Sequence, residues 1–214
     1  MRNTFIAGLT ATCLFSFCLS VQASDHRPFY IGLKGDIADA ADSDIKGAAT
    51  GKVKYGFSSG AGIVLGWQPA IFDTRNGDLR IELEGAYHAF GLDTVAANHN
   101  PSGDMKATAL MANLYYDWHL NKSWSTYIGA GVGRANVKFG TGQGLGNTDD
   151  SDNVTAWQAM AGLSYTAKSM PNTVWSLGYK YLDLNQPSFS SPGGSIKLDP
   201  VHEHAIELGV RYNF

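Results

Sequence analysis

Cysteine is almost absent from this chain. Cys13 and Cys18 are the only two cysteines, and both lie in the apolar, uncharged stretch of residues 6–21. If that stretch is removed on export, the mature protein contains no thiol. A small scaffold held together by disulfides is therefore excluded.

The N-terminus has the features of a secretory signal peptide. Arg2 supplies a positive charge, the apolar stretch follows, and residues 21–23 (Val-Gln-Ala) have the small-x-small form of a cleavage site. We expect residues 1–23 to be cleaved and residues 24–214 to form one domain.

Two further features are missing from the mature chain. No later run of about 18 apolar residues occurs, so no transmembrane helix is expected. There is also no excess of positive charge: the formal net charge is −3, and one unit more negative without Arg2. A mildly acidic protein is not expected to bind nucleic acid.

Alternating apolar and polar residues are abundant instead. Successive side chains of a strand point to opposite faces, so a period of two predicts a β-strand with two different faces. At the C-terminus, Ile206, Leu208, Val210, Tyr212 and Phe214 share one face. Eight segments follow this pattern, each about long enough to cross a bilayer as a tilted strand: residues 29–38, 56–68, 78–90, 106–119, 124–137, 154–167, 174–184 and 204–214.

The connections between these segments alternate in length. Residues 120–123 and 168–173 are short turns, and residues 69–77 are intermediate. The remaining four connections are long and rich in Gly, Asp, Asn, Ser and Pro: residues 39–55, 91–105, 138–153 and 185–203. This alternation predicts an eight-stranded antiparallel up-and-down barrel in the outer membrane, with long extracellular loops and both termini in the periplasm.

A soluble barrel of the lipocalin type has the same strand number and period, so the residue types must decide between them. Small residues dominate the polar face, as at Gly60, Gly62 and Gly66 on one segment and at Gly129 and Gly131 on another. A face turned to water would carry more Lys, Glu and Thr. Small residues suit a narrow interior crowded by a few long side chains, which favours a polar interior and a lipid-facing apolar surface.

Aromatic residues support this orientation. Five of them lie near matching segment ends, where a ring with one apolar and one wet side marks a membrane interface: Trp67, Trp118, Trp124, Trp175 and Phe214. We interpret them as a periplasmic aromatic girdle.

The charged residues of the segments fall on the opposite, inward face. They are Lys34, Asp36, Arg80, Glu82, Glu84, Asp117, Lys180, Glu207 and Arg211. Buried charges must be paired, and closure of the barrel brings the first, seventh and eighth strands together. We therefore expect Lys34, Glu207 and Lys180 to meet, Arg80 and Arg211 to find carboxylates on neighbouring strands, and the whole network to plug the barrel.

The chain resembles the small outer-membrane β-barrel family that includes opacity proteins and the OmpA-type membrane domain. The resemblance covers the mature chain and is carried by five stretches: Ile81–Glu84, Asn113–Asp117, Tyr127–Gly133, Tyr179–Leu184 and Leu208–Phe214. It implies recognition by the outer-membrane barrel assembly machinery through Val210, Tyr212 and Phe214, and it implies no catalytic residue. No peptidoglycan-binding domain follows the last strand, so anchoring to the cell wall is not expected.

The favoured function is that of a non-enzymatic structural or adhesive surface barrel acting through its four outer loops, in contact with outer-membrane lipids and lipopolysaccharide. The first alternative is a lipid-modifying enzyme, a lipid A deacylase or a phospholipase. Such an enzyme needs a Ser, a His base and an orienting group. The candidate bases are His88, His119, His202 and His204, with Asp117 and Asn113 nearby. No serine partners them in the sequence, so we interpret them as rim histidines.

A narrow channel for small solutes is the second alternative, and the charged interior argues against it. Acidic runs at residues 39–44 and 147–153 lack the regular ligand spacing of a calcium loop. We therefore expect solvated loops, a ligand of unknown identity at the cell surface, and no metal or cofactor.

Overall fold

The computed structural model describes residues 27–40, 43–47, 51–69, 76–95, 103–141, 150–185, 188–191 and 194–214. All its regular elements are strands: β1 (Phe29–Ala40), β2 (Ser43–Gly47), β3 (Gly51–Trp67), β4 (Gly77–Val95), β5 (Gly103–His119), β6 (Trp124–Thr141), β7 (Asp150–Thr166), β8 (Thr173–Leu184), β9 (Ser188–Ser191), β10 (Gly194–Leu198) and β11 (Val201–Asn213). The expected signal peptide, residues 1–23, lies outside the described residues.

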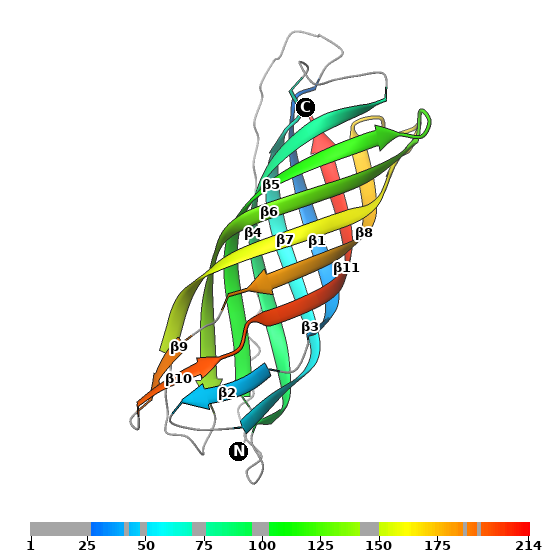
Figure 1. Ribbon diagram of the computed structural model, residues 1–214. Coiled ribbons are helices and arrows are strands. Elements are labelled where there is room, and N and C mark those ends of the chain that lie inside the picture. The colour runs from blue at the N-terminus through cyan, green and yellow to red at the C-terminus, as the bar shows by residue number, and fades with distance from the viewer. Residues whose placement is uncertain are drawn as a thin grey trace, which may run out of the picture.

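Eight of these strands close into an antiparallel barrel, as the sequence predicts. Neighbours in sequence pair from β3 through β8, β11 pairs with β8, and β1 closes the wall by pairing with both β3 and β11. At the closing seam Tyr30 lies opposite Asn213, and Asp36 lies opposite Glu207. Figure 1 shows long, strongly tilted strands, with the C-terminus at the upper end and β2, β9 and β10 at the lower end.

The two faces of the barrel wall follow the period of two. Large apolar side chains on the outer face are about half exposed, for example Leu33, Ile63, Leu110, Leu177 and Leu208. Charged side chains on the inner face are buried, with Arg80, Glu82, Glu84 and Lys180 all at most 3% exposed. Apolar side chains outside and charged side chains inside are the reverse of a water-soluble protein, and a barrel that faces lipid requires this arrangement.

The strands are longer than the sequence pattern predicts at one end of the barrel. Parts of the predicted long loops belong to strands: β3 begins at Gly51, β4 continues to Val95, β6 continues to Thr141, and β11 begins at Val201. The prediction was wrong there because the outward residues of these extensions are polar, although inward residues such as Val201 and Val137 stay buried. The apolar alternation then disappears while the backbone ladder continues.

Three short strands also lie inside segments predicted to be loops. β10 pairs with β2 and with β9, and β2 pairs with β3, so the sheet continues past the barrel rim. The short turns were predicted correctly. In the turn of residues 120–123, Asn121 Oδ1 accepts hydrogen bonds from the backbone N–H groups of Ser123 and Trp124 at 2.9 and 3.0 Å.

We find no helix in the described part of the chain with the length and apolar character needed to cross a membrane.

Candidate functional site

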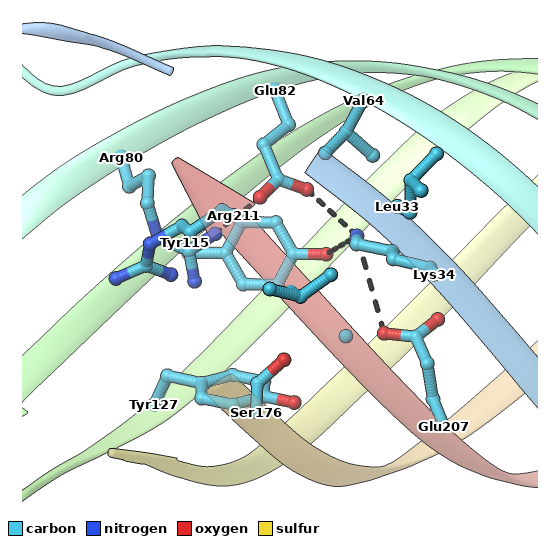
Figure 2. A pocket seen from close by; sticks show the side chains of 12 residues that line it. Leu33, Lys34, Val64, Arg80, Glu82, Tyr115, Tyr127, Ser176, Glu207 and Arg211 are labelled. Carbon is cyan, nitrogen blue, oxygen red and sulfur yellow. Dashed lines mark hydrogen bonds and ion pairs between the residues drawn. The ribbon is translucent and has the colours of Figure 1, made fainter. Parts of the chain in front are cut away.

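Lys34 lies at the centre of the barrel interior. Its Nζ lies 2.7 Å from Glu82 Oε2 and 3.2 Å from Glu84 Oε2, and it donates a hydrogen bond to the Tyr115 hydroxyl at 2.9 Å. Glu207 Oε1 lies 4.0 Å away on the other side. Figure 2 shows Glu82, Tyr115 and Glu207 converging on the Lys34 ammonium group. One ammonium thus links three strands by charge-assisted contacts inside a low-dielectric interior.

Arg80 organises the interior toward the short-turn end of the barrel. Its guanidinium group binds both carboxylate oxygens of Asp117, at 2.7 and 3.1 Å, and also contacts Glu82. The group lies over the Tyr115 ring, 4.0 Å from the ring centroid. Planarity allows a guanidinium to hold a carboxylate bidentately and to stack on an aromatic ring at the same time, which an ammonium cannot do.

Lys180 forms a second centre toward the loop end. It contacts Asp36 directly and lies 3.5 Å from Glu207 Oε2. The structure therefore brings together Lys34, Glu207 and Lys180. Arg211 differs from expectation, because its Nη2 lies 3.9 Å from Asp117 on β5, across the barrel and not on a neighbouring strand. The prediction considered only adjacent strands, whereas long side chains in an eight-stranded barrel reach the opposite wall.

Neutral polar groups complete the network, which was predicted from its charged residues alone. Tyr30 donates to Glu82 at 2.7 Å, and Asn113 donates to Glu84 at 2.7 Å. Gln158 donates to Asn113 at 2.8 Å. Each lies on the inward face of its strand, so continuing the period of two would have found them.

Inward glycines leave room for these side chains. A Cβ atom built on Gly66 would lie 1.8 Å from the Tyr30 ring, and one built on Gly129 would lie 2.3 Å from the Tyr115 ring. The small polar face in the sequence is therefore the space into which the interior tyrosines pack.

Little free space remains among the charges. A cavity of about 20 Å³ is lined by Lys34, Glu82, Tyr115, Glu207 and neighbouring residues. That volume is enough for roughly one water molecule. Buried side chains fill the barrel at this level.

The five rim aromatics occupy one end of the barrel. Trp67 lies opposite Phe29, Trp118 lies opposite Gly77, and Tyr165 lies opposite both Trp124 and Trp175. The four tryptophans and Phe214 are 38–49% exposed on the outer face. Phe214 N–H donates to the Phe29 carbonyl at 3.0 Å, which holds the C-terminus at the closing seam. Tyr212, 49% exposed, and Val210 share the outward face of β11 with Phe214.

Three of the four candidate histidines lie near the ends of the barrel. At the short-turn end, His119 Nε2 lies 2.8 Å from Asp78. At the loop end of β11, His204 Nδ1 lies 2.5 Å from the Tyr179 hydroxyl, and His202 Nδ1 lies 2.9 Å from the Tyr181 hydroxyl. The partners shown for these three are carboxylate and tyrosine groups, not a serine nucleophile.

His88 is not a rim histidine, and that prediction was wrong. It points into the barrel and is 3% exposed. Its neighbours there are Asp36 and Glu203, and Glu203 belongs to β11, not to the predicted loop of residues 185–203. Glu203 was misplaced because its strand begins at Val201 and not at residue 204. His88 lies inside the predicted segment of residues 78–90 but is enclosed, because β4 continues to Val95 and the barrel extends past it.

A second aromatic group lies on the outer surface toward the loop end, and the sequence analysis did not single it out. The Tyr181 ring packs against Trp157 at 5.2 Å and against His204 at 5.1 Å between centroids. Trp157 and Tyr179 are 43% and 49% exposed. The group lies where the outward face changes from apolar to polar residues, as expected for side chains at a membrane interface.

A known family accounts for this architecture. The model of the outer membrane protein β-barrel domain matches residues 9–214. The chain belongs to this family. It is a β-barrel protein of the bacterial outer membrane.

A curated relative of this outer-membrane barrel is the outer membrane protein PagN of Salmonella typhimurium, which is 30% identical over 146 residues. The match covers 61% of this chain and 59% of PagN, so it spans less than two thirds of that relative.

Solved structures share the fold at low sequence identity. Neisserial surface protein A is 20% identical with a TM-score of 0.56, and the match covers 87% of this chain and 97% of that one. OprG from Pseudomonas aeruginosa is 14% identical with a TM-score of 0.53, over the same shares of the two chains.

Proposed function

We propose that this protein is a non-enzymatic surface barrel whose structural or adhesive role is carried by the end of the barrel that bears the long connections. The observation that carries the proposal is the sheet that extends past the lipid-facing band. β4 has 19 residues and β6 has 18, whereas about 9–11 residues cross a bilayer as a tilted strand. We infer that the extra length projects from the cell as a rigid platform for the loops.

The outward face of this projecting sheet is polar. Past Leu110 and Val132 the exposed outward residues on β5 and β6 include Lys106, Arg134 and Lys138. Lys106 and Lys138 are direct cross-strand partners. Like charges opposite each other destabilise a sheet, and anions between them relieve that repulsion. We infer that the phosphate groups of lipopolysaccharide lie against these three residues.

Binding of fluorescent lipopolysaccharide to the purified protein in detergent tests this contact. Replacing Lys106, Arg134 and Lys138 by Gln is expected to weaken binding, with the largest loss at low salt because exposed charges are screened at high salt. Lys122→Gln is the matched control, because Lys122 is also exposed but lies in the short turn at the opposite end. Equal loss in both proteins would contradict the proposed contact.

Adherence of bacteria that display the protein tests the adhesive role. The full chain is compared with a variant in which residues 186–200, including β9 and β10, are replaced by a short Asn-Gly turn that joins β8 directly to β11. Cells with the full chain are expected to bind cultured epithelial cells in larger numbers than cells with the variant at equal surface abundance. If cells with and without the protein bind equally, adhesion is rejected and the structural role remains.

The enzymatic alternative is tested with labelled lipid A and phospholipid in detergent. His119 is an accessible candidate base, because it is exposed beside Asp78 at the barrel mouth. We expect no hydrolysis. Hydrolysis by the native protein that is lost in His119→Ala would overturn the non-enzymatic proposal.

A further inference from the structure

Three inward side chains meet inside the barrel beyond the Lys180 centre. Asp36 on β1, His88 on β4 and Glu203 on β11 each bring a potential ligand atom within 4.8 Å of the others. His88 Nδ1 lies 3.5 Å from Glu203 Oε1 and 4.0 Å from Asp36 Oδ1. These separations are longer than the donor–acceptor distance of a good hydrogen bond. They approach the spacing of roughly 3.3 Å between two ligand atoms that each lie about 2.0–2.1 Å from a tetrahedral metal ion.

Within the part of the chain that the structure describes, the facing atoms have no hydrogen-bond partner. They are Asp36 Oδ1, His88 Nδ1 and both carboxylate oxygens of Glu203. All three residues are at least nine-tenths buried, with Glu203 only 1% exposed. An unpaired buried carboxylate is costly, so these atoms favour a ligand that accepts electron pairs from them.

The charge of the interior points to the same ligand. In the described residues, the inner network holds six carboxylates (Asp36, Glu82, Glu84, Asp117, Glu203 and Glu207) and four Lys or Arg cations (Lys34, Arg80, Lys180 and Arg211). Apart from Asp78, which is buried beside His119 near the short turns, carboxylates outnumber these cations by two. Glu203 lies 3.5 Å from His88 and faces a second carboxylate, Asp36. One divalent cation beside Glu203 would balance the network.

Gly60 leaves space between the ligands. It is the cross-strand partner of both Asp36 and His88. A Cβ atom at this position would lie 2.5 Å from Asp36 Oδ1 and 2.8 Å from His88 Nδ1. Leu182 lies opposite Glu203, and the next inward residues of β4 and β11 toward the loop end, Phe90 and Val201, are also buried. A dry apolar cover strengthens coordination and slows the escape of an ion.

We propose that Asp36, His88 and Glu203 form a binding site for a first-row divalent transition-metal ion of the zinc class. Imidazole nitrogen together with carboxylate oxygen suits zinc and its neighbours, whereas magnesium and calcium are bound by oxygen alone. Lys180 holds the other oxygen of Asp36 and so orients the carboxylate toward the site. The site is enclosed, so the ion enters as the barrel closes and stabilises the closed state.

Zinc content after refolding tests the proposal. The full chain is refolded from urea into detergent micelles with Zn²⁺, treated with EDTA, passed through gel filtration and analysed by mass spectrometry for metal. We expect about one zinc per folded chain, retained in excess Mg²⁺ or Ca²⁺, and a shift of the urea midpoint to higher urea in the presence of zinc. The double variant His88→Gln, Glu203→Gln is expected to lose both effects.

Two further variants sharpen the test. His119→Gln removes an exposed histidine beside a carboxylate and is expected to keep the zinc. Gly60→Ala removes no ligand and no charge but fills the space between Asp36 and His88, so it is expected to lose the zinc even if the double variant does not fold. Native protein without bound zinc, or equal zinc in the native protein and Gly60→Ala, would overturn the proposal.

Discussion

At the scale of single residues, the inward tyrosines pack into space that inward glycines on neighbouring strands leave free. The hydroxyl of Tyr127 would lie 2.6 Å from a Cβ atom at Gly162 and 2.2 Å from one at Gly178. An interior this narrow accepts a tyrosine only where its neighbours have no side chain. The position of each glycine therefore determines where a long inward side chain can lie.

We expect Gly66→Ala to destabilise the barrel. Its new methyl group would displace Tyr30 from Glu82, and overpacking of this kind costs about 1–3 kcal/mol. Gly85→Ala is the control, because nothing lies within 4 Å of a Cβ atom at that exposed position. Urea unfolding of the two proteins in detergent measures the difference. Equal midpoints would show that the interior adapts more freely than the geometry indicates.

Removal of one central cation is expected to have a larger effect. Lys34→Met leaves Glu82 and Glu84 buried with fewer partners, and breaking a buried ion pair in this way costs about 3–5 kcal/mol. Lys106→Met removes an exposed lysine of the outer face and is expected to change the free energy of unfolding by less than about 0.5 kcal/mol. Similar unfolding curves for the two variants would argue against a stabilising network.

At the scale of elements, the period of two predicted the face of every residue more reliably than the ends of the strands. Leu33 and Lys34 were placed correctly on opposite faces from the sequence alone. Glu203 was not, because the strand that carries it continues where the outward residues are already polar. A ladder of backbone hydrogen bonds leaves no trace in the side-chain pattern, so strand ends beyond the membrane could not be predicted.

The contacts inside the barrel were predictable only between neighbouring strands. Asp36 and Glu207 follow from the closing seam, where they are cross-strand partners. The approach of Arg211 to Asp117 depends on the barrel diameter and on side-chain reach across it. Neither quantity can be read from one sequence.

The terminal strand β11 carries a prediction of its own. We expect Phe214→Ser to reduce the amount of protein assembled in the outer membrane of cells, while refolding in detergent is largely preserved. Phe29→Ser is the matched control, because Phe29 lies at the same rim with similar exposure, 52% against 48%. Immunoblots of unheated membrane fractions measure the folded form. Equal loss for both variants would indicate a general need for rim aromatics, not a terminal assembly signal.

At the scale of the whole molecule, the barrel has an interior filled by side chains and, at the end with the long connections, a sheet whose outward face is polar. The charge network lies across the barrel between the short turns and the apolar layer around Phe90 and Leu182. Side chains that fill the barrel at this level are expected to prevent the passage of solutes.

We expect no stable conductance from the purified protein in planar bilayers. Protein-free micelles are the control for spontaneous membrane defects. Channel openings of constant size that appear only with the native protein would contradict the filled interior and would favour the solute channel.

The closing seam has a consequence for the order of assembly. β1 and β11 are separated by almost the entire described chain, yet eleven Cα pairs join them. Until β11 arrives, β1 presents an open row of backbone donors and acceptors to its surroundings, a state that invites pairing with foreign strands. The barrel therefore closes only once β11 has been made, and until then the backbone edge of β1 stays open to other strands.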